Sequence, residues 1–338
     1  MNKHLVKLIT IAGLSILGLL IIDGLIYLGV IDEYTAQILT LAGINVVVAL
    51  GLNLISGFTG QLALGHAGFM AIGAYSTAYT VMHIHVQASF WPLLVGIAII
   101  IGGLITALFG LLIGFPTLRF KGDYLAIVTL GFGEIIRVIM INMEGITGGA
   151  AGLKGIPLFS DDINLSPLIS FTWIFIFMIF TIILIGNLIK SSPGRAIVSI
   201  REDEIAADSM GINIFYYKMF SFTLSAFFAG IGGGLYALFF GYLNPTMFDF
   251  LKSADFLVIV VLGGMGSIAG TVVTGFVLTY LQEFLRILQD YRLVIYPLIL
   301  ILIMLFKPTG LIGILIDIKD FAIKKLLPKV TGKIGEDS

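Results

Sequence analysis

Residues 190–218 read KSSPGRAIVSIREDEIAADSMGINIFYYK, a charged island inside a chain that is otherwise strongly hydrophobic. Hydrophobic residues make up 58% of the 338 residues, charged residues make up 12%, and the mean hydropathy is +1.08. Soluble domains carry roughly a quarter charged residues. The composition therefore predicts an integral membrane protein in which the island faces a soluble compartment.

Long hydrophobic segments lie on both sides of the island. A helix needs about 20 apolar residues to cross roughly 30 Å of hydrocarbon. We expect an all-α polytopic bundle of about ten spans, at residues 8–30, 35–55, 62–84, 91–115, 123–143, 170–189, 218–241, 254–265, 269–288 and 291–306. The first is expected to be a retained helix, since it is longer than a signal-peptide core and lacks a clear cleavage site. The eighth is short and breaks at Gly263, Gly264 and Gly266, so a nine-span alternative has residues 254–288 crossing once.

The basic residues predict an orientation, because cytoplasmic loops of membrane proteins are enriched in Lys and Arg. With ten spans and an internal N-terminus, 14 of the 19 basic residues fall on the cytoplasmic side: Lys3, Lys7, Arg119, Lys121, Lys190, Arg195, Arg201, Lys218, Lys307, Lys319, Lys324, Lys325, Lys329 and Lys333. The others are Arg137, Lys154, Lys252, Arg286 and Arg292. Nine spans would put the lysine-rich tail outside, so the count favours ten spans, with both termini and the island in the cytoplasm.

Within the island we expect a turn followed by a short amphipathic helix. Pro193 and Gly194 are expected to end the preceding span. The helix is predicted from Arg201 to Gly211, with acids in its first turn that oppose the positive end of the helix dipole. Its apolar side chains can fill a shallow groove on another protein: Ile205, Ala206 and Met210. The alternative is a solvated loop whose helix lies on the membrane surface.

Residues 50–75, LGLNLISGFTGQLALGHAGFMAIGAY, mix glycines with polar side chains: Asn53, Ser56, Thr59, Gln61 and His66. We expect the helical hydrogen-bond ladder to be interrupted here, near the middle of the membrane. Unpaired polar groups cost several kcal/mol in lipid, so they are expected to face the bundle interior or a water-filled path. The alternative is that the glycines are close helix contacts and the polar atoms join neighbouring helices.

Three weaker patterns accompany this segment. Glu134 and Arg137 are three residues apart and can neutralise each other on one helical face. A glycine-rich external loop follows at residues 147–157. Gly230 and Gly234 have the GxxxG spacing that is typical of close helix packing. None of these patterns alone defines a function.

Together these stretches resemble the permease subunits of branched-chain amino-acid ABC importers, the LivM type. The resemblance covers residues 35–310 in the family's order. It rests on LNLISGFTGQLALGHAGFMAIGAY, on TLGFGEIIR followed by TGGAAGLKGIP, and on SPGRAIVSIREDEIAADSMGINIFYYK. Urea and short-chain amide permeases share the REDEIAADSMGIN pattern, whereas TLGFGEIIR and TGGAAGLKGIP look more like the amino-acid branch.

The resemblance implies a permease that imports leucine, isoleucine and valine by alternating access. It implies a second homologous membrane subunit, two cytoplasmic ATPase subunits and an extracytoplasmic binding protein as partners. The ATPase-coupling helix then falls on Arg201, Glu202, Asp203, Glu204, Ala206, Ala207, Met210 and Gly211. The path should run between the paired subunits, and its best polar candidates in this chain are Asn53, Gln61 and His66.

The expected layout is a transmembrane permease domain at 1–310, which contains the coupling loop 190–218, and a cytoplasmic basic tail at 311–338 near anionic lipid of the cell membrane. The sequence has no GxxxxGK[ST] loop, so ATP and Mg²⁺ are expected on the partners. We expect no cofactor, metal site or nucleic-acid partner, and no enzyme activity in this chain. The rival class is a self-contained channel or secondary transporter, which needs ion-coupling residues within the chain and no ATPase dock.

Overall fold

The computed structural model describes residues 24, 32–84, 90–120, 122–159 and 166–306, and these are predominantly helical. Nine helices coincide with nine of the predicted spans: α2 (Glu33–Asn53), α3 (His66–His83), α4 (Trp91–Thr117), α5 (Asp123–Asn142), α7 (Ser166–Lys190), α10 (Ile214–Phe240), α11 (Phe250–Gly263), α12 (Ile268–Phe284) and α13 (Arg292–Phe306). The predicted first span at 8–30 and the tail at 311–338 lie outside the described residues, apart from residue 24.

Six helical stretches in the described ranges are long and apolar enough to cross a membrane: Glu33–Phe58, Trp91–Thr117, Asp123–Asn142, Leu168–Lys190, Ile214–Phe240 and Ile268–Gln289. Helices α3, α11 and α13 are not among them. Two of these three are short, with 14 residues in α11 and 15 in α13. The fold is therefore an all-α multi-pass bundle, and the number of ten crossings stays a prediction.

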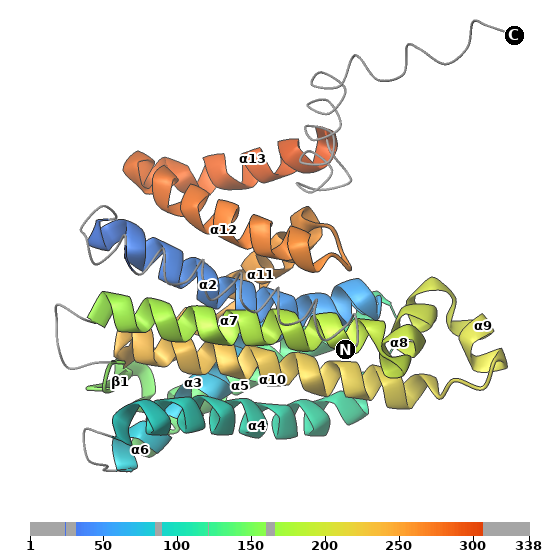
Figure 1. Cartoon of the computed structure of the whole chain (residues 1–338), viewed down its shortest axis with the longest axis horizontal. Helices are drawn as coiled ribbons and strands as arrows, with labels where there is room; N and C mark the ends of the chain where they lie inside the picture. Colours follow the sequence, from blue (N-terminus) through green and yellow to red (C-terminus); the bar gives the residue numbers. More distant parts are fainter. Residues whose placement is uncertain (1–23, 25–31, 85–89, 121, 160–165, 307–338) are drawn as a thin grey trace, which may run out of the picture.

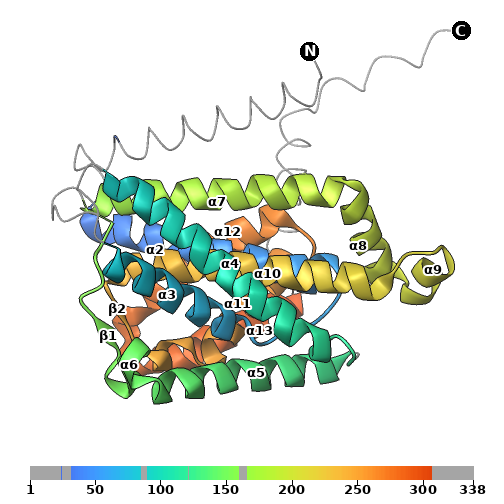
Figure 2. The same cartoon turned by 90° about the horizontal axis from the view of Figure 1, so that it is seen from below.

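Helix α10 forms the centre of the bundle and packs against α2, α3 and α4 (Figures 1 and 2). Its glycines make this possible. A Cβ at Gly233 would lie 1.9 Å from the Met70 carbonyl oxygen of α3, and a Cβ at Gly232 would lie 2.3 Å from Val48 of α2. Gly230 is in equally close contact with α4. The GxxxG pattern in α10 thus serves helix packing, as predicted.

Helices α11 and α12 form an antiparallel hairpin rather than one continuous helix. The turn between them contains Gly264 and Gly266, whose φ angles of 86° and 83° favour glycine. The side chain of Gln282, near the end of α12, donates to Asp255 near the start of α11 at 3.3 Å. The break predicted at the glycines is confirmed.

The bundle has two different ends (Figure 2). One end carries the α4–α5 connection and two short helices, α8 (Ser192–Glu202) and α9 (Glu204–Ser209). The other carries α6 (Glu144–Thr147) and two strands, β1 (Leu153–Lys154) and β2 (Tyr242–Leu243). The described basic residues that were predicted to be cytoplasmic lie at the first end, in or next to its helices: Arg119, Lys190, Arg195, Arg201 and Lys218. The side of the membrane that each end faces stays a prediction.

The strands were not predicted. Residues 147–157 were expected to form a glycine-rich loop, but Leu153 pairs with Leu243 and Lys154 pairs with Tyr242 in an antiparallel ladder. A Cβ at Gly152 would lie 2.5 Å from the Leu243 carbonyl oxygen, so glycine lets the two backbones approach. Two-residue strands are too short to show the alternating pattern from which strands are predicted.

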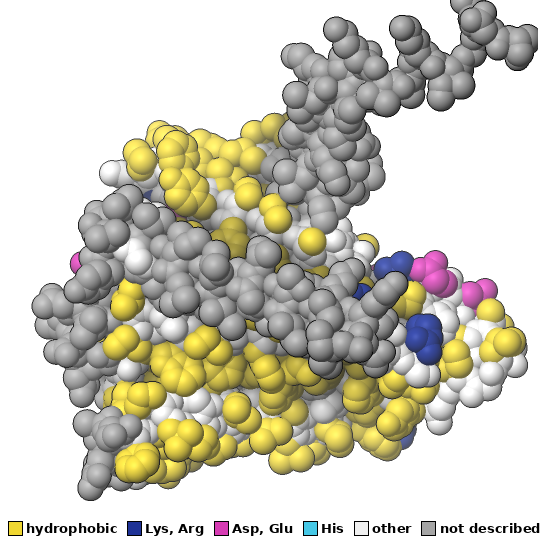
Figure 3. Space-filling view, in the orientation of Figure 1, with side chains coloured by type: hydrophobic (Ala, Val, Ile, Leu, Met, Phe, Trp, Pro, Cys, Tyr) yellow, Lys and Arg dark blue, Asp and Glu magenta, His cyan; other side chains and the backbone are white. Residues whose placement is uncertain are grey.

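Apolar side chains cover the flank of the bundle. On α4, Leu104, Leu108 and Leu112 recur every four residues and are 57%, 60% and 63% exposed. Figure 3 shows hydrophobic side chains over the long side of the molecule, while Lys, Arg, Asp and Glu gather at the α8 and α9 end. Large exposed apolar surfaces of this kind face lipid or another membrane protein.

Candidate functional site

The main irregularity of the bundle lies between α2 and α3, and we call residues 54–65 the interrupted segment. It begins with the π-helix η1 (Leu54–Phe58) and continues without helical structure until α3 starts at His66. π-Helical turns are rare and frequent at functional sites. Irregular backbone at membrane depth is tolerated where protein or a wet cavity covers it, and η1 is fully buried. The predicted interruption is confirmed.

Hydrogen bonds from Asn53 link the start of this segment to the α11–α12 turn and the start of α12. Its side-chain amide donates to the Ser267 carbonyl oxygen at 3.2 Å and to the Thr271 hydroxyl at 2.9 Å. Its Oδ1 accepts the backbone N–H of Gly266 at 2.9 Å. Asn53 is completely buried, and these bonds satisfy both of its polar atoms. Its geometry is that of a structural link, and its place on a transport path stays a prediction.

His66 and Gln61 differ from Asn53 because each leaves a buried polar atom unpaired. The Ser225 hydroxyl donates its single proton to the Gly51 carbonyl oxygen at 2.5 Å, so His66 Nε2, 3.0 Å away, donates to Ser225. His66 Nδ1 is then an acceptor, and it has no partner among the described residues. The same holds for Gln61 Oε1 and for the Ser56 hydroxyl. Three unpaired polar atoms thus cluster within the interrupted segment and the first residue of α3.

The charged island forms two helices instead of the single one predicted from Arg201 to Gly211. Helix α7 ends at Lys190 as expected, but Pro193 then lies in the first turn of α8, where its missing N–H is not needed. Helix α8 ends at Glu202. Asp203 is extended and caps α9 by accepting the backbone N–H groups of Ile205 and Ala206, so Arg201 and Glu202 belong to α8.

Helix α9 buries Ala207, whereas two large apolar side chains in and directly after the helix are exposed. Ile205 and Met210 are 80% and 83% exposed, whereas Ala207 is buried against the chain itself. Glu204 Oε2 pairs with the largely buried Lys218 Nζ of α10 at 2.9 Å. Of the residues predicted to couple to a partner, Ala207 and Glu204 therefore face inward. Gly211 ends the segment with a φ of 82°.

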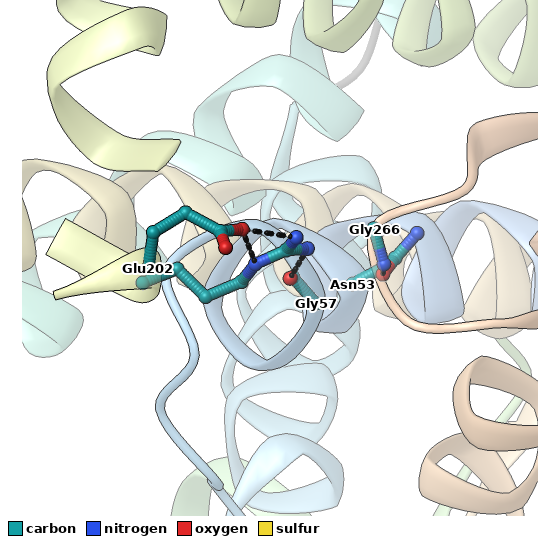
Figure 4. Close-up of polar contacts among 5 residues, drawn as sticks. Asn53, Gly57, Glu202 and Gly266 are labelled. Atoms are coloured by element: carbon teal, nitrogen blue, oxygen red, sulfur yellow. Dashed lines mark hydrogen bonds and ion pairs between the residues drawn. The ribbon is translucent and has the colours of Figure 1, made fainter. Parts of the chain in front are cut away.

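Arg201 connects α8 to the interrupted segment. Figure 4 labels its two partners, Gly57 and Glu202, and marks the contacts with dashed lines. Arg201 Nη1 donates to the Gly57 carbonyl oxygen at 2.9 Å. Its Nε and Nη2 both reach Glu202 Oε1, at 3.1 and 2.6 Å. The link was not predicted, because Arg201 and Gly57 are 144 residues apart in the sequence.

A cavity of about 350 Å³ lies between the interrupted segment and the island. Its polar lining includes Thr59, Gln61, Asp123, Arg201, Glu204 and Lys218. A second, apolar cavity of about 480 Å³ lies among α3, α4, α5 and α6. The predicted ion pair on α5 is confirmed, with Arg137 Nε 2.7 Å from Glu134 Oε2. Among the described residues no group of three or more His, Asp or Glu side chains could hold a metal ion.

This architecture defines a class: a multi-pass helical membrane protein with an interrupted polar segment inside and short helices at one end. A family model described as a branched-chain amino acid transport system permease component matches residues 34–305. The chain belongs to this family, and the predicted LivM-type resemblance is confirmed.

Curated relatives agree with the family. The high-affinity branched-chain amino acid transport system permease protein LivM of Escherichia coli K12 is 37% identical over 307 residues, which cover 83% of this chain and 71% of the relative. The LivH protein of the same strain is 24% identical and covers 81% and 92%. A probable LivM of Methanocaldococcus jannaschii is 24% identical and covers 83% and 93%. No solved structure gives a significant match to this chain.

Proposed function

We propose that this chain is the membrane-spanning permease subunit of an ATP-driven ABC importer for leucine, isoleucine and valine, which works by alternating access. The observation that carries the proposal is the contact between the island and the interrupted segment, through Arg201 and Gly57. An importer driven from the cytoplasm needs such a contact between a docking element and the transport path. The names of the relatives, which are branched-chain amino acid permeases, support the substrate class.

The proposed partners are a second homologous permease subunit, two cytoplasmic ATPases that bind ATP and Mg²⁺, and an extracytoplasmic binding protein. The ATPase dock is proposed on the outer face of α9. Ile205 and Met210 support it, because large apolar side chains exposed on a short protruding helix are typical of interaction surfaces. Glu204 and Ala207 are proposed to hold α9 in place for docking.

The transport path is proposed to run along the interrupted segment, between this chain and the second permease subunit, with Asn53, Gln61 and His66 as its polar residues. The unpaired atoms Gln61 Oε1 and His66 Nδ1 support this role, since buried polar groups need a partner and a hydrated path supplies one. Asn53 contributes by fixing the shape of the segment.

The membrane layout is proposed to have ten crossings, with a permease domain at 1–310 and a cytoplasmic tail at 311–338 in the cell membrane. Both termini are proposed to be cytoplasmic. The antiparallel α11–α12 hairpin supports ten crossings over nine, since it returns the chain to the end where α11 begins.

Reconstitution tests the function. The complete complex, in proteoliposomes with ATP inside and the binding protein outside, is expected to accumulate labelled leucine, and omission of either the ATPases or ATP is expected to abolish uptake. Leucine uptake by this chain without any ATPase would overturn the importer and favour the self-contained transporter. Competition by urea or acetamide, with none by isoleucine, would move the substrate to the amide branch.

The dock is tested by the double variant Ile205→Ser, Met210→Ser. Loss of two exposed apolar side chains is expected to weaken ATPase binding and so lower co-purification about tenfold or more. This is the effect expected when a small anchor residue is removed from an interface. Ile287→Ser is the matched control, because Ile287 is 78% exposed in η5 (Leu285–Tyr291), far along the chain from the island. Unchanged co-purification of the double variant would remove α9 from the dock.

A further inference from the structure

Arg201 lies in the last turn of α8, and its partly exposed side chain reaches the interrupted segment. Its guanidinium donates hydrogen bonds to two partners. Nε and Nη2 donate to Glu202 Oε1, and Nη1 donates to the Gly57 carbonyl oxygen. A planar guanidinium presents its donors in a fixed fork, so few of its orientations keep both contacts. The link therefore gives a displacement of α8 a direct route to Gly57.

Glycines shape the space that Arg201 occupies. A Cβ at Gly60 would lie 2.8 Å from Arg201 Cγ, and a Cβ at Gly266 would lie 2.6 Å from Arg201 Nη1. Gly60 belongs to the interrupted segment and Gly266 to the α11–α12 turn, and both have φ angles in the left-handed region. Two separate parts of the chain, the interrupted segment and the α11–α12 turn, thus approach Arg201 of α8 through glycines, without a side chain.

The Gly57 carbonyl lies in the last turn of η1, where carbonyl groups lack helical partners and carry the negative end of the helix dipole. A cation is favoured at such a position, and a hydrogen bond from a charged donor is about twice as strong as a neutral one. Among the described residues, this is the one hydrogen bond between the helices α8 and α9 and the interrupted segment. Gln61 and His66 follow Gly57 by four and nine positions.

We infer that Arg201 is a positioning residue that transmits the movement of α8 and α9 to the interrupted segment and to the α11–α12 turn, and so couples ATP hydrolysis to transport. The inference rests on the proposed function. It separates two tasks within the island: α9 receives the partner, and Arg201 at the end of α8 passes the displacement inward. The proposed dock residues and the link residue are then expected to fail in different ways when substituted.

The test compares Arg201→Gln with Arg195→Gln in the complete complex in proteoliposomes. Arg195 is on the same helix, but its guanidinium donates to the Lys190 carbonyl oxygen at 3.2 Å, just before α8 begins. Arg201→Gln is expected to keep ATPase co-purification and ATP hydrolysis within about twofold, and to lower leucine imported per ATP about tenfold, as for loss of one charge-assisted hydrogen bond. Arg195→Gln is expected to keep the wild-type ratio.

Arg201→Lys should recover part of the leucine imported per ATP, because lysine keeps the positive charge but lacks the planar set of guanidinium donors. If the Arg201→Gln complex does not assemble, Glu202→Gln is tested instead, because it weakens the contact that orients the guanidinium but leaves the hydrogen bond to Gly57. A decrease of about twofold or more in leucine imported per ATP then supports the link. An unchanged ratio in the variant that assembles, or an equal loss in Arg195→Gln, overturns the inference. Failure of the wild-type complex to import leucine would instead overturn the proposed function.

Discussion

Single glycines determine how closely the helices of this bundle approach. A glycine inside a helix is about 1 kcal/mol less favourable than alanine, so it needs a compensating contact. Gly233 has one: α10 and α3 touch there, and a Cβ would meet the Met70 carbonyl oxygen at 1.9 Å. Gly131 of α5 is also helical, but a Cβ there would meet nothing within 4 Å. The two positions form a matched pair.

Gly233→Ala is expected to lower the melting temperature of the purified protein in detergent, because overpacking against backbone costs about 1–3 kcal/mol. Gly131→Ala is expected to leave it unchanged or raise it slightly, since alanine gains at most about 1 kcal/mol of helix propensity. Thermal unfolding followed by intrinsic fluorescence measures both. Equal shifts for the two variants would contradict the packing role of Gly233.

Asn53 also joins neighbouring segments, but it does so through hydrogen bonds rather than through close packing. Asn53→Leu keeps the size of the side chain but leaves the Gly266 N–H without its partner, whereas the Ser267 carbonyl oxygen keeps its hydrogen bonds from Thr271. A donor left unpaired away from water costs about 1–3 kcal/mol, so a clear loss of thermal stability is expected. Asn142→Leu, at the exposed end of α5, is the control and should be nearly neutral. A similar small effect at both positions would show that Asn53 is not a structural link.

At the scale of elements, hydropathy alone predicted nine helices, because each lies within a few residues of an apolar run long enough to be noticed. The island was predicted less well. Pro193 indicated a stop, although proline is also favoured in the first turn of a helix, where it begins α8. The periodicity of α9 revealed its apolar side chains but not which of them face inward, so Ala207 was assigned to the dock although it is buried.

The candidate site shows the same limit of sequence patterns. Its residue types were predicted, since Asn53, Gln61 and His66 stand out as polar within an apolar run. Their partners were not, because the contacts join distant segments: Asn53 binds the α11–α12 turn more than 200 positions away, and Arg201 binds Gly57. A pattern within one segment carries no information on such pairings.

Helix α9 is only six residues long, too short to be stable without tertiary support. Its support is the Asp203 cap, the buried Ala207 and the ion pair between Glu204 and Lys218. Lys218→Met is expected to speed hydrogen exchange of the α9 amides several-fold, since a partly exposed pair contributes up to about 1 kcal/mol. Exchange in α12 should not change, and an unaffected α9 would show that the ion pair with Lys218 is not needed to hold the helix.

At the scale of the whole molecule, the two ends differ in chemistry. One end presents charged helices that are proposed to meet soluble ATPases, and the other presents a glycine-rich connection with a short β-ladder. An importer needs these ends on opposite sides of the membrane. The positions of the basic residues predict this orientation, and the described helices run back and forth between the two ends as it requires.

Orientation and span number can be measured together with single cysteines, because the natural sequence has none. Ten spans put Ile287→Cys outside and Asp208→Cys inside, so an impermeant maleimide is expected to label the first in intact cells and the second only after permeabilisation. Leu108→Cys, on the apolar flank of α4, should resist labelling in both states. If residues 254–288 crossed once, both positions would lie inside and neither would react in intact cells. A reversed labelling pattern would show that the bundle has the opposite orientation in the membrane. Labelling of Ile287→Cys alone in intact cells thus requires an odd number of crossings between α9 and η5, which the α11–α12 hairpin provides together with α10.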